Sequence, residues 1–283
     1  MDVDPPLIVD DEYWLADNPE SAFRQPSGKP SHMEAFGLWL KLTKISAFAV
    51  RTLVREAVPS QIHHSFQLQY VVDKSKVAPP GTTTSEWRER TVAQLNTAMS
   101  QWVDSVPDHC ANVPLATAFP VLLSHLTLFS LVRWSPNMGD RVFATQSATL
   151  FLGYYLNQIL IYRPFIPSVR SDASSKLTSR VRFPFPALPI CLNAARTVIR
   201  ILDAEKKSGF SNFPVIIRAC QEAGGILITH VWRLKTRDRA LAAEGKSREI
   251  LGPSITDLVA DVHKIIDTLD SMADRWPLAY SLV

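Results

Sequence analysis

The run from Tyr154 to Pro167 constrains the fold more than any other segment, because it joins an apolar helical pattern to an abrupt stop. Its apolar side chains face nearly every direction around a helix, which is typical of a helix buried inside a helical protein. The stop is Arg163-Pro164: proline has no amide hydrogen and disfavours helical geometry in the residue before it. The sequence therefore predicts a core helix that ends at about Tyr162.

Several other segments carry helix-start signals. A hydroxyl residue followed three positions later by an acidic residue forms a capping box, in which each side chain accepts a hydrogen bond from a backbone amide. Such pairs predict three helix starts. They are Ser31 with Glu34, Thr83 with Glu86, and Ser254 with Asp257.

Apolar residues at spacings of three and four predict the buried faces of four helices. The second of these helices should end by Pro107, the third should be capped by Gly209, and the fourth should precede Pro277. The faces are Leu38, Leu42, Ile45 and Ala49; Leu95, Met99, Trp102 and Val106; Cys191, Ala194, Ala195, Val198, Ile199 and Leu202; and Leu258, Val262, Ile265, Leu269, Met272 and Trp276.

The rest of the chain also favours helices joined by loops. Phe213 to Leu234 is expected to be a buried helix, weakened at Gly224-Gly225 by about 1 kcal/mol per glycine relative to alanine. No segment alternates convincingly as a β-strand. Loops are expected at 79–81, 167–189 and 242–253. The sequence thus predicts an all-α, multi-helix, bundle-like domain with long loops.

Four motifs occur in an order that resembles a known family. They are Asp10-Asp11-Glu12-Tyr13-Trp14 with Phe23, Gln25-Pro26 and Gly28-Lys29-Pro30-Ser31; Lys74-Ser75-Lys76 leading to Trp102-Val103-Asp104-Ser105-Val106-Pro107; Arg133-Trp134-Ser135-Pro136 before Gln146-Ser147; and the run from Tyr154 to Pro167. Together they resemble the fungal-specific transcription factor domain, the regulatory region downstream of the DNA-binding zinc cluster in fungal activators of the xylanolytic type. The resemblance covers most of Leu7 to Pro167 and continues more loosely to Trp276.

The resemblance implies a nuclear regulatory domain that restrains or licenses transcription through contacts with co-regulators or the transcription machinery. It leaves open a small-molecule effector and a homodimer. The family's DNA-binding module is a set of six closely spaced cysteines that holds two zinc ions, and this sequence contains no such set. DNA binding would therefore require a module N-terminal to Met1, which would make Met1 an internal or mispredicted start, or else the chain is a solitary regulatory domain.

Residues 1–30 are interpreted as an N-terminal segment and residues 31–283 as one helical regulatory domain. Two blocks, 54–69 and 110–132, interrupt the family pattern within it. Removing the first joins Leu53 to Tyr70, and removing the second brings Asp108-His109 next to Arg133-Trp134, as in the family. Both blocks have the length of a short fungal intron read in frame. We hypothesise that they are retained introns, which mature transcripts containing them would refute.

The second block also has a competing interpretation as a membrane span. Leu115 to Val132 is mostly apolar and approaches the minimum length that crosses a bilayer. Pro120, Ser124 and His125 interrupt it, and its flanks lack a bias of positive charge. A buried helix or a noncoding insert is therefore preferred, and no membrane contact is expected.

Composition excludes few function classes. The 30 basic and 27 acidic residues give a net charge of +3, which provides no electrostatic case for direct nucleic-acid binding. The three cysteines, Cys110, Cys191 and Cys220, are odd in number and far apart, as expected in a reducing compartment. Met1 to Glu12 is acidic and does not resemble a signal peptide.

No residue is assigned a catalytic, cofactor-binding or metal-binding role, and the chain is not expected to be an enzyme. Each candidate site has a plainer interpretation, which the sequence favours. His63-His64 are interpreted as surface or intronic histidines rather than a metal site, and Trp87, Trp102, Tyr154 and Tyr155 as core residues rather than a stacking platform. Asp10, Asp11 and Glu12 are interpreted as a solvated turn rather than a general acid. Arg233, Lys235, Arg237 and Arg239 are interpreted as a solvated helix end rather than a phosphate-binding or nuclear-import patch.

Arg163 receives a structural interpretation, because it directly follows a run expected to be buried. Its guanidinium is expected to reach helix-end carbonyls or a buried acid rather than a ligand. The sequence therefore favours a regulatory domain with an apolar ligand pocket between helices. The alternatives are an α-helical lipid-binding or small-molecule-binding protein, an enzyme without a recognisable motif, and a non-functional truncated product.

Overall fold

The computed structural model describes residues 4–15, 22–54, 83–111, 139–166, 185–206, 214–245 and 252–282. Within these ranges the chain forms helices and no β-strand, which confirms the predicted all-α class. The short helical turns are η1 (Asp11–Tyr13), the π-helical η3 (Val50–Val54) and η8 (Arg163–Phe165). The α-helices are α1 (Met33–Ala49), α3 (Thr84–Asp104), α4 (Asp108–Ala111), α5 (Arg141–Tyr162), α6 (Ala187–Glu205), α7 (Pro214–Ala243), α8 (Ile255–Ala273) and α9 (Pro277–Tyr280).

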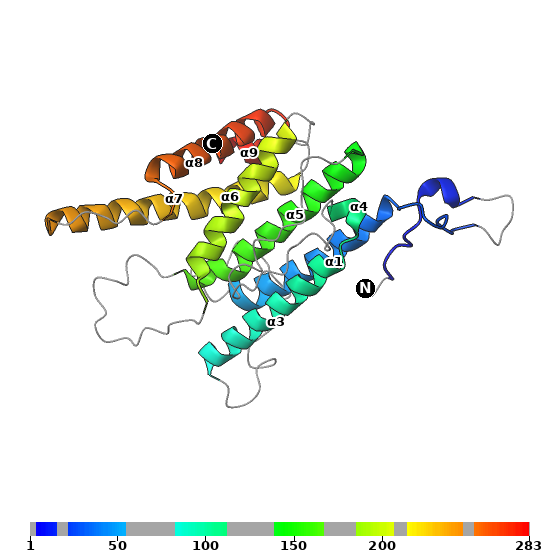
Figure 1. Ribbon diagram of the computed structural model, residues 1–283, viewed down its shortest axis with the longest axis horizontal. Helices are drawn as coiled ribbons and strands as arrows, with labels where there is room; N and C mark the ends of the chain where they lie inside the picture. Colours follow the sequence, from blue (N-terminus) through cyan, green and yellow to red (C-terminus); the bar gives the residue numbers. More distant parts are fainter. Residues whose placement is uncertain are drawn as a thin grey trace.

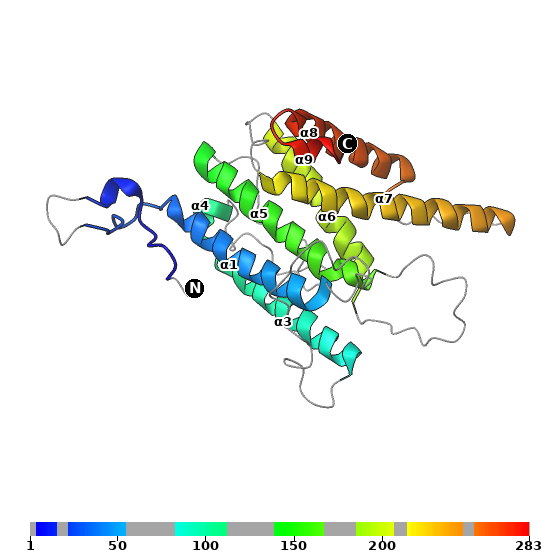
Figure 2. The same ribbon diagram turned by 180° about the vertical axis from the view of Figure 1, so that it is seen from behind.

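Helix α5 lies at the centre of the molecule (Figure 1). Helices α1, α3 and α4 contact it from the N-terminal half of the chain, and α6 and α7 contact it from the C-terminal half. Every residue from Leu150 to Tyr162 is buried, which is why the sequence of this helix shows no polar face. The predicted core helix is therefore confirmed. The view from behind shows the same central position (Figure 2).

Both ends of α5 follow from local chemistry. The carboxylate of Asp140 accepts hydrogen bonds from the amides of Val142 and Phe143 at 2.7 and 3.3 Å, which caps the helix start. The α-helix ends at Tyr162, as predicted, and the chain continues as the 3-10 turn η8 with Pro164 inside it. Proline is tolerated there because the first residues of a helical turn need no amide donor.

The N-terminal half packs on α5 through aromatic rings and one buried hydrogen bond. The Trp102 ring of α3 stacks on the Tyr154 ring with a centroid distance of 5.7 Å and meets the edge of Phe151. Its indole nitrogen donates a 2.9 Å hydrogen bond to the carbonyl of Leu38 on α1. One side chain thereby joins α1, α3 and α5.

Helix α1 also approaches α5 closely at Gly153. A Cβ atom at this position would lie 2.6 Å from the Trp39 ring and 3.0 Å from the Leu42 side chain. Leu42 is fully buried, and the Trp39 indole is rigid and partly buried, so a methyl group here would force them to shift. Glycine at position 153 therefore favours this close contact.

The C-terminal half is an assembly of α6, α7 and α8, with α9 against α8. The predicted capping boxes at Thr83 and Ser254 are both present, and α3 ends at Asp104, before Pro107 as expected. The heptad of α8 buries Leu258, Ile265, Leu269 and Met272, while Val262 is partly buried. Trp276, the last predicted heptad residue, follows the end of α8 and precedes α9.

Two predicted boundaries are wrong. Helix α7 continues nine residues beyond the predicted end at Leu234 and stops at Ala243, where Gly245 adopts a φ of 67°. Its lysines and arginines are good helix formers, so the helix persists after its apolar periodicity fades. The predicted loop 167–189 is also too long, since α6 begins at Ala187. Pro189 is tolerated in the first turn of α6 because an amide hydrogen at this position would have no acceptor within the helix.

Several predictions fall outside the described residues. These are the loop at 79–81, the cap at Gly209, the pair His63-His64, the motifs Lys74-Ser75-Lys76 and Arg133-Trp134-Ser135-Pro136, the span Leu115 to Val132, and nearly all of blocks 54–69 and 110–132. Val54 ends η3, and Cys110 and Ala111 are buried in α4. None of the helices in the described ranges combines the length and apolar character needed to cross a bilayer.

The close contact at Gly153 yields a stability prediction with an internal control. Alanine usually stabilises a helix relative to glycine by about 1 kcal/mol. Gly153→Ala should instead destabilise the protein by about 1–3 kcal/mol, because the new methyl group overlaps Trp39 and Leu42. A Cβ atom at Gly225 meets nothing within 4 Å, so Gly225→Ala should be neutral or stabilising. Urea unfolding measures both, and equal effects at the two positions would contradict the packing account.

Candidate functional site

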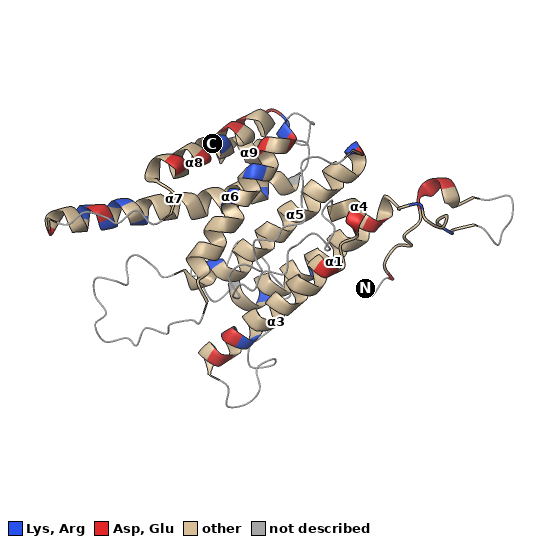
Figure 3. Cartoon of the chain, viewed as in Figure 1, with Lys and Arg blue, Asp and Glu red and all other residues tan. Residues whose placement is uncertain are grey.

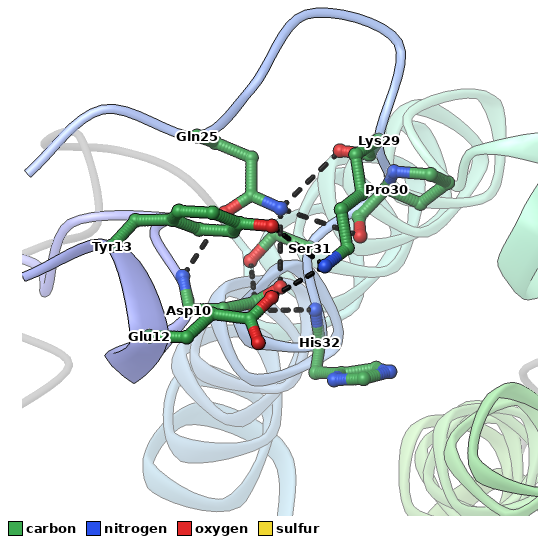
Figure 4. A network of polar contacts seen from close by, with 8 residues as sticks. All are labelled: Asp10, Glu12, Tyr13, Gln25, Lys29, Pro30, Ser31 and His32. Carbon is green, nitrogen blue, oxygen red and sulfur yellow. Dashed lines mark hydrogen bonds and ion pairs between the residues drawn. The ribbon is translucent and has the colours of Figure 1, made fainter. Parts of the chain in front are cut away.

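A network of polar side chains ties the N-terminal segment to the start of α1 (Figure 4). We call it the N-terminal clasp. At its centre is Asp10, which is only 8% exposed although the residues around it are mostly exposed. The clasp consists of Asp10, Glu12, Tyr13, Gln25, Lys29, Ser31 and the backbone amide of His32.

Asp10 caps α1 from outside the helix. Its Oδ1 accepts 2.8 Å hydrogen bonds from the Ser31 hydroxyl and from the His32 amide, and the Ser31 Oγ in turn accepts from the Met33 amide at 3.0 Å. The Gln25 side chain bridges back to Asp10: its Nε2 donates to Oδ2 at 3.1 Å and its Oε1 accepts from the Asp10 amide at 3.0 Å. A carboxylate at this position also interacts favourably with the helix dipole.

These contacts control the charge of Asp10. Burial alone raises the pKa of the carboxyl group, but the hydrogen bonds from Ser31, Gln25 and the His32 amide outweigh it and hold the pKa below its usual value. Asp10 is therefore ionised at neutral pH. Its negative charge sits where α1 exposes unpaired amide hydrogens.

A second, exposed part of the clasp centres on Lys29. Its Nζ is ion-paired with Glu12, donates a 2.7 Å hydrogen bond to the Tyr13 hydroxyl, and lies 5.0 Å from the centre of the Tyr13 ring. The hydrogen bonds with Glu12 and Tyr13 raise the pKa of Lys29, and those from Lys29 and Tyr13 lower the pKa of Glu12. Gly28, with a φ of 80°, allows the turn that brings Lys29 over η1.

Two predictions about this region are wrong. The acidic cluster is not wholly a solvated turn, because Asp10 is buried as a helix cap while Asp11 and Glu12 are exposed. Ser31 and Glu34 do not form the predicted capping box: α1 begins one residue later than predicted, with His32 at its N-cap, and the Ser31 hydroxyl accepts from the Met33 amide while donating to Asp10. Glu34 Oε2 instead lies 3.2 Å from Nε2 of His109 on α4.

Arg163 does reach a buried acid, as one of its two structural interpretations predicted. Its guanidinium is ion-paired with Glu222 of α7, and Arg218 also contacts Glu222 at 3.0 Å. The Glu222 side chain is only 6% exposed, whereas Arg163 and Arg218 are 40% and 55% exposed. The two arginines therefore neutralise a carboxylate that would otherwise be buried without a partner.

The buried nucleophiles are poorly suited to catalysis. Burial raises the pKa of each cysteine thiol, Cys110, Cys191 and Cys220, to about 12, so all three stay protonated at neutral pH. Burial likewise raises the pKa of Tyr154 to about 12 and raises that of Tyr155. Nowhere in the described ranges do three or more His, Cys, Asp or Glu side chains gather as a metal site would require.

The structure also places the other candidate residues. Trp87, Trp102, Tyr154 and Tyr155 are all buried, so their interpretation as core residues is confirmed. Lys235, Arg237 and Arg239 are exposed and Arg233 is partly buried, and all four lie within the C-terminal part of α7. Sequence patterns alone did not reveal that Asp10, Gln25 and Ser31 meet. The only signal was their co-occurrence in one resemblance motif.

In comparisons with known proteins, no family model, no curated protein and no solved structure matches this chain.

The clasp predicts a pH-dependent contribution to stability. Asp10→Ala should lower the free energy of unfolding by about 1–2 kcal/mol at pH 7, because the His32 amide loses its acceptor. Since the folded pKa of Asp10 is lowered, the wild type keeps this stabilisation above the unfolded pKa of about 4 and loses it as the pH falls further. The difference in the free energy of unfolding between the wild type and Asp10→Ala should therefore disappear in acid.

Urea unfolding between pH 7 and 3 measures this effect, and Asp11→Ala, on an exposed neighbour, is the matched control. A gap for Asp10→Ala that persists unchanged to pH 3 would contradict the role of the charge.

The Arg163 contact predicts an asymmetry between two arginines. Arg163→Met removes the tie between η8 and α7 and should cost about 2 kcal/mol, because Glu222 is left in a largely buried site with one partner. Arg218→Met removes a more exposed pair within one helix turn and should cost about 0.5 kcal/mol. Thermal and urea unfolding measure both; the reverse order would overturn the assignment.

Proposed function

We propose that this chain is a regulatory domain of a fungal transcription factor, which acts in the nucleus through protein contacts. The proposal starts from the ordered motifs and takes support from how the described motif residues contact one another. Asp10, Gln25 and Ser31 bind each other in the clasp, and Trp102 stacks on Tyr154. The first three residues belong to one motif, and Trp102 and Tyr154 belong to two, so shared contacts provide a physical reason for these residues to occur together.

A further contact links two motifs across the domain. Gln146, at the start of α5, donates a 3.0 Å hydrogen bond from its Nε2 to the carbonyl of His32, directly after the Gly-Lys-Pro-Ser motif. Ser147 beside it is fully buried. The N-terminal clasp, the start of α1 and the start of α5 therefore form one continuous set of contacts.

In this proposal the domain contributes regulation, and DNA binding requires a zinc-cluster module that is not in this sequence. The isolated chain is expected to lack sequence-specific DNA affinity, because its charge is nearly balanced and its three cysteines are separate and buried. Co-regulators or the transcription machinery are its proposed partners. A small-molecule effector acting between the helices and a homodimer are compatible with this role.

A reporter assay tests the proposal. The chain is placed between a heterologous DNA-binding domain and an activation domain, and reporter expression in a fungal host is compared with that from a helical spacer of equal length. We expect expression to differ several-fold at equal protein level. Asp10→Ala should shift expression towards the spacer value because it frees the N-terminal segment, whereas Asp11→Ala should not.

Expression indistinguishable from the spacer for every fusion would contradict the proposal. Saturable turnover of a metabolite by the purified chain would contradict it in favour of an enzyme.

A further inference from the structure

Helix α7 presents an apolar and basic stripe to solvent. Its first part packs against α6 and α8, and its last part projects beyond the body of the molecule (Figures 1 and 2). Exposed side chains recur at Ile228, Trp232, Lys235 and Arg239, spacings of four, three and four that align them along one face. Ile228 and Trp232 are 58% and 52% exposed, which is unusual for large apolar residues. We call these four residues the tail.

The opposite end of the molecule carries a second exposed apolar surface, on the segment held by the clasp (Figure 1). It consists of Trp14, Leu15 and Phe23, which are 47%, 91% and 54% exposed, and we call it the head. The Trp14 and Phe23 rings lie 6.4 Å apart. Phe23 adopts a φ of 57°, a conformation rare for residues other than glycine, and its amide donates a 2.8 Å hydrogen bond to the Tyr13 carbonyl.

Head and tail differ in charge. The sequence of residues 1–23 holds seven of the 27 acidic residues and none of the 30 basic ones. Asp11 and Glu12 are exposed beside Trp14, and Glu12 is also ion-paired with Lys29. The tail, by contrast, ends in Lys235 and Arg239, with Arg237 exposed between them. Figure 3 shows acidic residues at η1, and basic residues interspersed with acidic ones along the projecting part of α7.

We propose that the head of one molecule docks on the tail of a second copy of this chain. Opposite charge favours the encounter and fixes its orientation, and burial of Trp14, Leu15 and Trp232 supplies the affinity. The two surfaces lie at opposite ends, so one molecule cannot join its own head and tail in this structure. The proposed function is compatible with a homodimer, and this proposal specifies how two copies would bind. It rests on these two surfaces alone, so it does not depend on the transcriptional role.

The geometry determines the kind of assembly. A contact between two different surfaces leaves a free head on one molecule and a free tail on the other, so further copies can add. Each surface contains only a few large side chains, which is typical of a weak, transient contact. Concentration-dependent chains in the range of about 10 µM to 1 mM are therefore expected, rather than one fixed dimer.

Analytical ultracentrifugation of the full chain tests the proposal. The weight-average mass should rise with concentration at 50 mM salt, and the apparent Kd should weaken about tenfold at 500 mM salt because charge pairs are screened. A tail variant, Trp232→Glu with Lys235→Glu, and a head variant, Asp11→Lys with Leu15→Lys, should each be monomeric alone. All four residues are exposed, so both variants should keep the wild-type helicity.

Mixing the two variants provides the decisive result. Each retains one intact surface, so an equimolar mixture should form a 1:1 dimer that grows no further. Leu278→Lys, which changes another exposed apolar residue, should assemble like the wild type. A wild type that is monomeric at 1 mM would overturn the proposal. A mixture that stays monomeric would also overturn it. If the tail variant abolishes assembly and the head variant does not, the contact is instead a symmetric one between α7 helices, and the proposal is wrong.

Discussion

Burial of α5 from Leu150 to Tyr162 is the constraint on which the rest of the structure depends. A helical segment with no solvent face must satisfy its own polar side chains inside the protein, since each unpaired buried group costs about 1–3 kcal/mol. Asn157 does so with α1, where it contacts Ser46 and donates a 3.3 Å hydrogen bond to the Leu42 carbonyl. Tyr162 does so with α3, donating from its hydroxyl to Asn96 at 2.9 Å. The same polar atoms that make burial costly therefore fix which helices surround α5.

The clasp follows from that arrangement. Because α1 is held against α5 by Trp102, Gly153 and Asn157, its N-terminus occupies a defined position, and Asp10 can cap it from a distant part of the sequence. Capping by a residue outside the helix makes the N-terminal segment part of the fold rather than an appendage.

The sequence was informative wherever local chemistry decides the structure. Pro164 ends α5, hydroxyl and acidic residues cap α3 and α8, and the heptad of α8 faces the core, all as local patterns predict. The sequence did not predict the tertiary contacts. Ser31 and Glu34 match the capping pattern, but the Ser31 hydroxyl binds Asp10 instead, and no local signal reveals a partner 21 residues away. Gly153 likewise reads as one small residue in an apolar run, and only the approach of Trp39 explains it.

The proposed transcriptional role is the central claim, and we expect it to depend on a DNA-binding module joined to this domain. Full-length sequencing of mature transcripts, extended upstream of the codon for Met1, tests it most directly. The account predicts one reading frame that runs from a cluster of six closely spaced cysteines into the segment from Asp10 to Ser31. Transcripts in which translation begins at Met1, with no cysteine cluster in frame, would contradict it.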